Sequence, residues 1–457
     1  MRNGDISFWY ADCGLPPPRP PLQGDTHADV CIIGAGYTGL WAAWYLKQQA
    51  PGLAIVMVER EFAGFGASGR NGGWLTGGFA WNHRRYLEVS DRSAVQAMIA
   101  AVAGTVAEVI AVAEACGIDA DIHRTDELLV ATNPAQMARL VAFQAARESW
   151  DVAADRSHLI GAAALQARLA VHRAEGAMVI AGVARLQPAK LVKGLAAAVA
   201  ALGVQIAEGT TVLHYGPGLV ETDRGRVRAP VILRATEGFT AGLPGHGRDW
   251  LAMNSAQIVT DPLPDALWDQ IGWQGRELFG DYAHSYCYAQ RTREGRIAMG
   301  GRGVPYRYGS RTDHRGQTQG ETIRQLTAIL HRHFPQLRAV PVAHAWCGTL
   351  AVPRDWCASV GFDAGTGLGY AGGYVGVGVS TSNLAGRTLA DLALGQQTDR
   401  TALPWVNRKV RQWEGEPLRW LGVHAMYRLF NLADRAEARG GGQSRLAALA
   451  NRVMGRH

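Results

Sequence analysis

Apolar positions near the start of the chain form two short continuous runs separated by a segment with helical spacing. Residues 30–33 are a continuous apolar run, which indicates a buried strand, and residues 40–50 read as a helix. Pro51 and Gly52 break this helix, and residues 54–58 form a second buried strand. The order of strand, helix and strand predicts the first unit of an α/β domain.

Both kinds of element recur further along the chain. Residues 93–116 predict one or two amphipathic helices, followed by a short strand at 127–131 and another helix at 134–150. Strands of the α/β type then resume, and the segment from 249 to 340 is again β-rich. Because α/β pieces appear early, in the middle and late, we expect the chain to pass twice between an α/β domain and an α+β domain with a mixed or antiparallel sheet. The predicted bounds are 1–27 for an N-terminal arm, 28–90, 151–248 and 341–410 for the α/β domain, 91–150 and 249–340 for the second domain, and 411–457 for a C-terminal helical segment.

The two ends of the chain have distinct patterns. The arm before Thr26 is rich in proline and should be extended rather than helical. Residues 417–438 predict an amphipathic helix that packs on its own protein or on a subunit partner, and a membrane-surface role stays open. Its apolar positions are Leu418, Leu421, Ala425, Leu429 and Ala433, with Arg419, Arg428 and Arg435 among them.

Composition and charge exclude several classes of protein. A chain of 457 residues can bury two sizeable cores. The formal charge of +7 comes from scattered basic residues without an aromatic-interleaved basic patch, so we expect no nucleic-acid partner. The uncharged stretch 30–46 contains a glycine motif, so it is not predicted to be a transmembrane segment. The first residues lack the apolar core of a signal peptide, so we expect a cytoplasmic protein.

The six cysteines show neither a CxxC pair nor metal-ligand spacing with histidine. We therefore expect free thiols and no metal site. The cysteines stand at positions 13, 31, 116, 287, 347 and 357.

The turn after the first strand carries the strongest chemical signal. Gly34 permits a tight turn, Gly36 allows phosphates to approach the main chain, and Gly39 lets the following helix lie close to the strand. The helix then directs its N-terminal N–H groups at an anion. Glu59 follows the second strand, twenty residues beyond Gly39, where an acidic side chain accepts hydrogen bonds from an adenosine ribose. This context predicts a dinucleotide site.

A second glycine-rich run directly follows the second strand, where residues 64–73 read Gly-Phe-Gly-Ala-Ser-Gly-Arg-Asn-Gly-Gly. Together with the first motif it resembles the FAD-dependent amino-acid and amine oxidase superfamily, and Ser-Phe-Trp at 7–9 is similar to the bacterial gamma-glutamylputrescine oxidase-like branch. Further resembling patches lie at 186–212, 231–237, 296–303 and 372–378. The resemblance implies a Rossmann-like FAD-binding domain of the glutathione-reductase-type family 2, interleaved with an α+β substrate domain.

The resemblance also implies which residues hold FAD. Residues 373–378 lead into a helical run at 379–394, so they are expected to place N–H groups against the flavin edge that becomes negative on reduction. The implied cofactor-binding residues are Gly34, Gly36, Tyr37, Thr38, Gly39, Glu59, Arg60, Gly66, Ala67, Ser68, Arg70, Asn71, Gly72, Gly73, Val212, Ala235, Thr236, Gly348, Gly373, Tyr374, Gly376, Val377 and Gly378.

The implied reaction is oxidation of a C–N bond in an amine or amino acid. Hydride passes to flavin N5, water hydrolyses the imine, and O2 reoxidises the flavin with formation of H2O2. Tyr288, Tyr282, Trp74 and Arg291 are the candidate residues around the substrate, although strand alternation directs about half of such side chains away from a pocket.

Three departures from the family leave alternatives open. Sarcosine oxidases carry a lysine in the strand where this chain has Ile-Ala-Met at 297–299, and many relatives have Gly-His-Gly where Gly-Val-Gly stands at 376–378. A dehydrogenase that passes electrons to a quinone or carrier protein, or a flavin-bound redox sensor or subunit, therefore remains possible. Cys347 falls where monomeric sarcosine oxidases attach flavin covalently, but no lysine or arginine stands near it in sequence, so we expect FAD to be non-covalent. An oligomer is possible.

Overall fold

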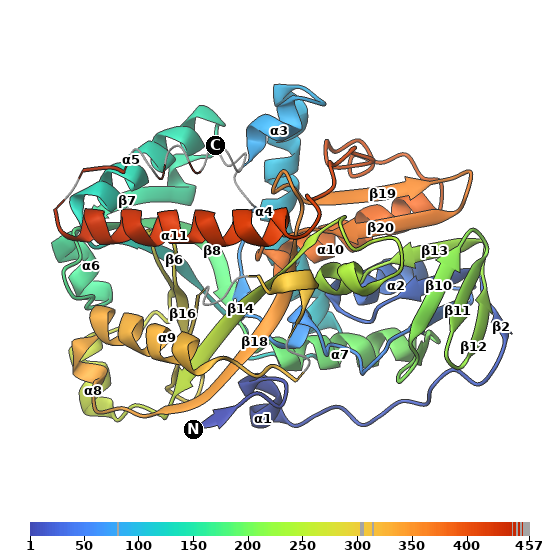
Figure 1. Ribbon diagram of the computed structural model, residues 1–457, viewed down its shortest axis with the longest axis horizontal. Coiled ribbons are helices and arrows are strands. Elements are labelled where there is room, and N and C mark those ends of the chain that lie inside the picture. Colours follow the sequence, from blue (N-terminus) through green and yellow to red (C-terminus); the bar gives the residue numbers. More distant parts are fainter. Residues whose placement is uncertain are drawn as a thin grey trace.

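The computed structural model describes residues 1–79, 82–301, 306–312, 315–440, 442–444, 447 and 450. Three β-sheets organise these residues (Figure 1). A six-stranded α/β sheet and a small four-stranded sheet lie on one side of the molecule, and a ten-stranded mixed sheet lies on the other. This arrangement confirms the predicted fold class, an α/β domain interleaved with an α+β domain.

The six-stranded sheet has the order β19-β20-β13-β3-β4-β9 and is parallel except between β19 and β20. Ile32 and Met57 face a core shared with the helices, whereas Cys31 and Val56 face the four-stranded sheet. Burial on both faces explains the continuous apolar runs in the sequence. The bounds are β3 (Val30–Ile33), β4 (Ile55–Val58), β9 (Gln205–Ala207), β13 (Val231–Arg234), β19 (Ser359–Asp363) and β20 (Leu368–Gly372), with the helices α2 (Tyr37–Gln49), α4 (Arg92–Ala115), α7 (Pro188–Ala201) and α10 (Gly378–Ala393).

The four-stranded sheet has the order β10-β11-β12-β2. Its strands are β2 (Thr26–His27), β10 (Val212–Gly216), β11 (Leu219–Thr222) and β12 (Gly225–Arg228).

The ten-stranded sheet has the order β1-β18-β14-β17-β16-β15-β6-β8-β5, with β7 paired to β8. Its strands are β1 (Arg2–Asn3), β5 (Trp74–Leu75), β6 (His123–Ala131), β7 (Ser157–Gly161), β8 (Gly176–Arg185), β14 (Leu251–Thr260), β15 (Leu278–Asp281), β16 (Tyr288–Arg291), β17 (Ile297–Gly301) and β18 (Val342–Val352). The remaining helices are α1 (Phe8–Cys13), α3 (His83–Leu87), α5 (Pro134–Ser149), α6 (Ala162–Arg168), α8 (Asp265–Ile271), α9 (Gly320–His333) and α11 (Leu418–Ala438). Short 3-10 helices are η1 (Ala67–Gly69), η2 (Ala154–Arg156), η3 (Glu237–Gly242), η4 (Tyr308–Ser310) and η5 (Pro335–Leu337).

The predicted domain bounds do not match the sheets everywhere. The segments 151–248 and 341–410 were assigned to the α/β domain, yet β7, β8 and β18 belong to the ten-stranded sheet. The short strand β5, inside the predicted segment 28–90, joins the same sheet by pairing with β8. An apolar strand pattern does not specify which sheet the strand joins, because the pairing partner is distant in sequence.

The N-terminal arm is not extended throughout, because residues 8–13 form α1. The Ser7 hydroxyl accepts a hydrogen bond from the backbone N–H of Tyr10 and caps this helix. Trp9 is buried against Trp346, and its indole N–H donates to the Asn71 carbonyl oxygen at 2.7 Å. The arm thus packs directly on the second glycine-rich run.

The predicted elements between 93 and 150 agree closely with α4, β6 and α5. The resembling patch 186–212 contains α7 and β9 and ends at the first residue of β10. The patch 296–303 contains β17, and its residues Arg302 and Gly303 lie outside the described residues. The predicted C-terminal segment covers residues 411–457. Within it, residues 441, 445–446, 448–449 and 451–457 lie outside the described residues.

The helix α11 exists as predicted, but most of its predicted apolar stripe does not face the protein. Leu418 and Leu421 are 67% and 52% exposed. The buried side chains are instead Arg419, Val423, Phe430, Ala433 and Glu437. Polar partners select this face, because the Arg419 guanidinium donates to the Gly247 carbonyl oxygen and stacks on Tyr306.

The helix α4 is long and apolar enough by composition to cross a membrane, with a mean hydropathy of 1.9 over its most apolar window. Such a helix is weak evidence for a span, since core helices pass the same test. One side of α4 packs in the main core through Met98 and Val109, and another lines the cavity described below through Ile99 and Ala103. Contact on both sides accounts for its apolar composition.

Candidate functional site

A cavity of about 1350 Å³ is lined by residues from both large sheets. This volume exceeds the roughly 300–1,000 Å³ of common ligand pockets, so a large and a small ligand can be held together. Of the 23 predicted cofactor-binding residues, all line the cavity except Gly39, Gly73 and Gly373.

The first glycine turn lies at the carboxyl end of β3, where α2 begins. Gly34 has φ of 100°, and a Cβ there would lie 2.9 Å from the Ala235 carbonyl oxygen. A Cβ on Gly39 would lie 2.1 Å from the Gly34 carbonyl oxygen, so Gly39 serves the contact between helix and strand. The Ser68 hydroxyl accepts a hydrogen bond from the Tyr37 N–H at 2.8 Å, which brings the second glycine-rich run against the N-terminus of α2.

Glu59 lies at the end of β4 and lines the cavity. Its carboxylate accepts hydrogen bonds from the backbone N–H groups of Ala35 at 2.9 Å and Glu61 at 3.0 Å. Burial raises the pKa of Glu59, and these two N–H donors oppose the rise. Arg60 beside it also lines the cavity, and its guanidinium lies over the Phe239 ring.

The second glycine-rich run is held by Arg70 and Asn71. The Arg70 side chain is buried, donates from Nε to the Phe65 carbonyl oxygen at 2.7 Å and stacks on the Phe65 ring. Burial lowers the pKa of Arg70 to about 10. The Asn71 amide donates to the Ser68 carbonyl oxygen and accepts from the Gly73 N–H, both at 2.8 Å, which closes the turn.

The loop between β20 and α10 brings the third motif to the cavity. The Tyr374 hydroxyl lies 2.8 Å from the Thr38 hydroxyl, so the loop is joined to the first turn of α2. Glu237 accepts hydrogen bonds from the N–H groups of Gly373 at 3.0 Å and Tyr374 at 3.1 Å, and from that of Ala351. Burial raises the pKa of Glu237 to about 7, against the effect of these donors.

Tyr288 and Trp74 lie on the cavity wall formed by the ten-stranded sheet. Their rings meet edge to face with centroids 5.9 Å apart. Gly300 and Gly72 leave room for the Tyr288 ring, since a Cβ on either would lie within 2.6 Å of it. The Tyr288 hydroxyl lies 3.1 Å from the Ser255 hydroxyl.

Arg291 does not face the cavity and does not join the other three candidate catalytic residues. Its guanidinium lies 3.9 Å from the centre of the Trp268 ring and donates to the Trp273 carbonyl oxygen at 3.1 Å. Arg291 follows Tyr288 by three positions on β16, so alternation puts the two on opposite faces of the sheet.

Cys347 also faces away from the cavity. Its neighbour Gly348 on β18 lines the cavity, whereas the Cys347 thiol donates to the Gln317 carbonyl oxygen at 3.3 Å. All six cysteines are free of disulfides, as expected.

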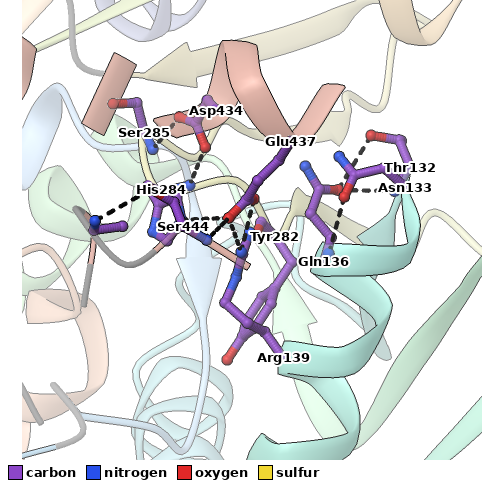
Figure 2. A network of polar contacts seen from close by, with 11 residues as sticks. Thr132, Asn133, Gln136, Arg139, Tyr282, His284, Ser285, Asp434, Glu437 and Ser444 are labelled. Atoms are coloured by element: carbon purple, nitrogen blue, oxygen red, sulfur yellow. Dashed lines mark hydrogen bonds and ion pairs between the residues drawn. The ribbon is translucent and has the colours of Figure 1, made fainter. Parts of the chain in front are cut away.

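A polar network joins α11 to residues that line the cavity (Figure 2). Tyr282, Arg139 and His284 line the cavity, and Arg139 forms an ion pair with Glu437 of α11 at 2.7 Å. The His284 Nε2 lies 3.1 Å from the same carboxylate, and Asp434 accepts the N–H of His284 at 2.8 Å. Because Arg139 already supplies positive charge to Glu437, this acidic cluster is satisfied without a metal ion.

The acidic cavity residues that the sequence interpretation missed include Glu237 and Glu127. Glu237 follows the Ala-Thr strand end, where its φ of 44° is unusual for a residue with a side chain. Glu127 lies within the predicted strand 127–131, where period-two alternation with Leu129 could have indicated that both face one side.

The described residues fit a dinucleotide with a flavin. The glycine cradle and the N-terminus of α2 suit a pyrophosphate. Within the described part of the chain, Trp74 Nε1 and Gln257 Oε1 are buried on the wall of the same cavity without a hydrogen-bond partner. Buried polar atoms of this kind are normally satisfied, so a bound group is the expected partner.

Comparison with known proteins agrees with this geometry. Residues 29–392 match the family described as DAO, FAD dependent oxidoreductase. The chain is 28% identical over 411 residues to gamma-glutamylputrescine oxidoreductase of Escherichia coli, covering 86% of this chain and 90% of the relative. Glycine oxidase from Geobacillus kaustophilus has a similar structure, with a TM-score of 0.67 and 19% identity over 81% of this chain and 96% of that one. L-proline dehydrogenase from P. horikoshii superposes with a TM-score of 0.65 and 16% identity, covering 85% and 98% of the two chains. The chain belongs to the FAD-dependent oxidoreductase (DAO) family, and FAD is the cofactor that this membership implies.

Proposed function

We propose that this protein oxidises a C–N bond of an amine or amino acid. The observation that carries the proposal is a single cavity that joins the glycine cradle at α2 to a wall containing Tyr288, Trp74 and Tyr282. When bound, FAD supplies a hydride acceptor at N5. The gamma-glutamylputrescine oxidoreductase relative supports an amine as the substrate.

In this proposal the cofactor-side residues bind and orient FAD. The N-terminus of α2 and Gly36 hold the pyrophosphate, and Glu59 receives the adenosine ribose. Glu237 and Thr38 fix the loop containing Tyr374, so that the N–H groups at the start of α10 are arranged before binding.

The substrate-side residues bind the substrate and exclude water from it. Tyr288 offers a hydroxyl and Trp74 an indole N–H to the substrate, and the apolar side chains of Leu129 and Ile180 line the same cavity. Hydride loss requires a neutral amine, and contact with the Trp74 ring and with Leu129 favours the neutral form. The product imine is then hydrolysed by water.

We propose that FAD is held without a covalent bond, because the Cys347 thiol lies on the face of β18 opposite the cavity. Intact-mass measurement of the denatured holoenzyme checks this. The expected mass is that of the polypeptide alone, and a mass increased by one FAD contradicts the proposal.

We propose O2 as the electron acceptor, with H2O2 as the second product. A second candidate is a dehydrogenase that uses a quinone or carrier protein. It is favoured by one observation: the lining of the cavity, within the described part of the chain, contains arginines but no lysine such as the one sarcosine oxidases use for O2.

The test is anaerobic mixing of the yellow holoenzyme with a panel of primary amines, secondary amines and amino acids. Bleaching of the flavin by at least one member is expected. Admission of air should then restore the colour and release one H2O2 per turnover. Bleaching with slow recovery in air but rapid recovery with a quinone would support the dehydrogenase. A flavin that no member bleaches would contradict both.

A further inference from the structure

The helix α11 has an outer face on which apolar side chains remain exposed. The helix runs lengthwise across the side of the molecule that faces the viewer in Figure 1. Leu432 is 55% exposed, and Leu418 and Leu421 are also more than half exposed. The exposed apolar residues recur at spacings of three, four or seven positions, which puts them on one face of the helix: Leu418, Leu421, Ala425, Leu432 and Ala436. Such an aligned apolar row on a surface indicates an interaction site.

Exposed arginines adjoin this apolar row. They are Arg428, Arg435 and Arg439, and among the described residues no ion pair joins them to an acidic side chain. Exposed arginines on other helices do have such partners, as Arg324 does with Glu321 on α9 at 2.6 Å. We call the apolar row and these three arginines the outer face of α11.

Both acidic side chains of α11 are turned toward the protein (Figure 2). Asp434 accepts the backbone N–H groups of His284 at 2.8 Å and Ser285 at 3.0 Å. Glu437 is buried in its ion pair with Arg139. The outer face therefore carries positive charge without any negative charge from its own helix, so the complementary partner is anionic.

The leucines decide which anionic partner fits. A bilayer of anionic phospholipid offers phosphates to the guanidinium groups and, directly beneath them, an apolar layer that the leucines can enter. A nucleic acid offers phosphates but would leave an apolar row in water. A second copy of the same face would bring the arginines of both copies together with no acidic group of either helix between them.

We propose that α11 binds this protein to the surface of a membrane that contains anionic phospholipid, with the helix lying in the plane of the interface. Its 21 residues span about 30 Å, over which the leucines enter the lipid and the arginines bind the phosphates. Phe430, on the inner face of α11, lines the cavity, so one helix contacts the lipid and the cavity. The inference does not depend on the proposed reaction.

The experiment is co-sedimentation of the purified holoenzyme with vesicles of two compositions. One is phosphatidylcholine alone, and the other contains about one quarter phosphatidylglycerol. Binding to the anionic vesicles is expected to be at least about tenfold stronger, because each arginine near such a surface contributes about fivefold. This binding should weaken as salt is raised from about 0.1 M to about 1 M. Equal binding to both vesicles, or binding to neither, overturns the proposal.

Matched variants test whether α11 is the part that binds. Leu432→Ser should weaken binding to the anionic vesicles at least about threefold. Leu213→Ser is its control, because Leu213 on β10 is also 55% exposed, and it should leave binding unchanged. Joint replacement of the three arginines of the outer face by glutamine should weaken binding at least about tenfold. Its control replaces three exposed arginines of the four-stranded sheet and its turn by glutamine: Arg224, Arg226 and Arg228.

FAD content and melting temperature verify that each variant is folded. Losses of vesicle binding that are as large in the control variants as in the α11 variants overturn the inference. Analytical ultracentrifugation without vesicles tests the contact between copies. A monomer that is unchanged by Leu432→Ser is expected, and a dimer that Leu432→Ser dissociates overturns the lipid assignment and gives the outer face to a second copy of this chain.

Discussion

The hydroxyl groups of Thr38 and Tyr374 lie 2.8 Å apart, although the two residues are 336 positions apart in the chain. Thr38 belongs to the first turn of α2, and Tyr374 to the loop that precedes α10. Both side chains are buried. This hydrogen bond fixes the two ends of the predicted cofactor site relative to each other.

Tyr374→Phe should therefore weaken FAD binding. The substitution leaves the buried Thr38 hydroxyl without this partner, which costs about 1 kcal/mol, or roughly a fivefold increase in the dissociation constant of FAD. Fluorescence titration of the apoprotein with FAD measures the change. Thr38→Val should have a similar effect, and the double variant should be little worse than either single one. Additive losses would show that the two hydroxyls act independently.

Glu237→Ala should disorder the loop at residues 373–374. The variant leaves the N–H groups of Ala351, Gly373 and Tyr374 without the carboxylate that now accepts them, so FAD affinity should fall about tenfold or more. Glu221→Ala is the control, because Glu221 forms an exposed ion pair with Arg226 and should contribute little. Equal FAD affinity in the two variants would argue against the positioning role.

The protein should lose stability relative to Glu127→Gln as pH rises. Burial raises the pKa of Glu127 from 4.5 to about 7, so the folded state holds this proton more tightly than the unfolded chain. The resulting stabilisation is fully present below pH 4.5 and is lost as pH rises through about 7, a difference of up to about 3 kcal/mol. Melting temperatures of both proteins between pH 5 and pH 8, where Arg147 stays charged, should diverge in favour of the variant. A gap that does not grow with pH would show that the carboxyl has an ordinary pKa.

Arg139→Met should loosen α11 from the cavity. Glu437 is 1% exposed and would lose its ion pair, keeping only contacts among the described residues to His284 and the Ser444 N–H, which costs about 3 kcal/mol. Thermal unfolding should shift to lower temperature, and limited proteolysis should cut within α11 sooner. The exposed pair of Arg85 and Glu88 supplies the control, since Arg85→Met should change neither readout. Unchanged proteolysis in Arg139→Met would indicate that apolar contacts alone hold the helix.

The local pattern of the sequence was sufficient for the first strand, helix and strand of the six-stranded sheet. The turn from β3 to α2 needs glycine where φ is positive and where the helix contacts the strand, and these requirements are visible in the spacing of Gly34, Gly36 and Gly39. The continuous apolar runs at 30–33 and 54–58 likewise reflect burial on both faces of one sheet.

Tertiary structure alone decided which side chains share the cavity. Arg291 and Tyr288 lie on one short strand. Only the packing of that strand shows that Tyr288 faces the cavity and that Arg291 stacks on Trp268 on the opposite face. The assignment of β8 and β18 to the large sheet depends on hydrogen bonds to strands far away in the sequence, as does the meeting of Glu237 with the loop before α10. Backbone conformation and amphipathic period are encoded within a few neighbouring residues, whereas strand pairing and the choice of a buried face are set by the free energy of contacts between distant segments.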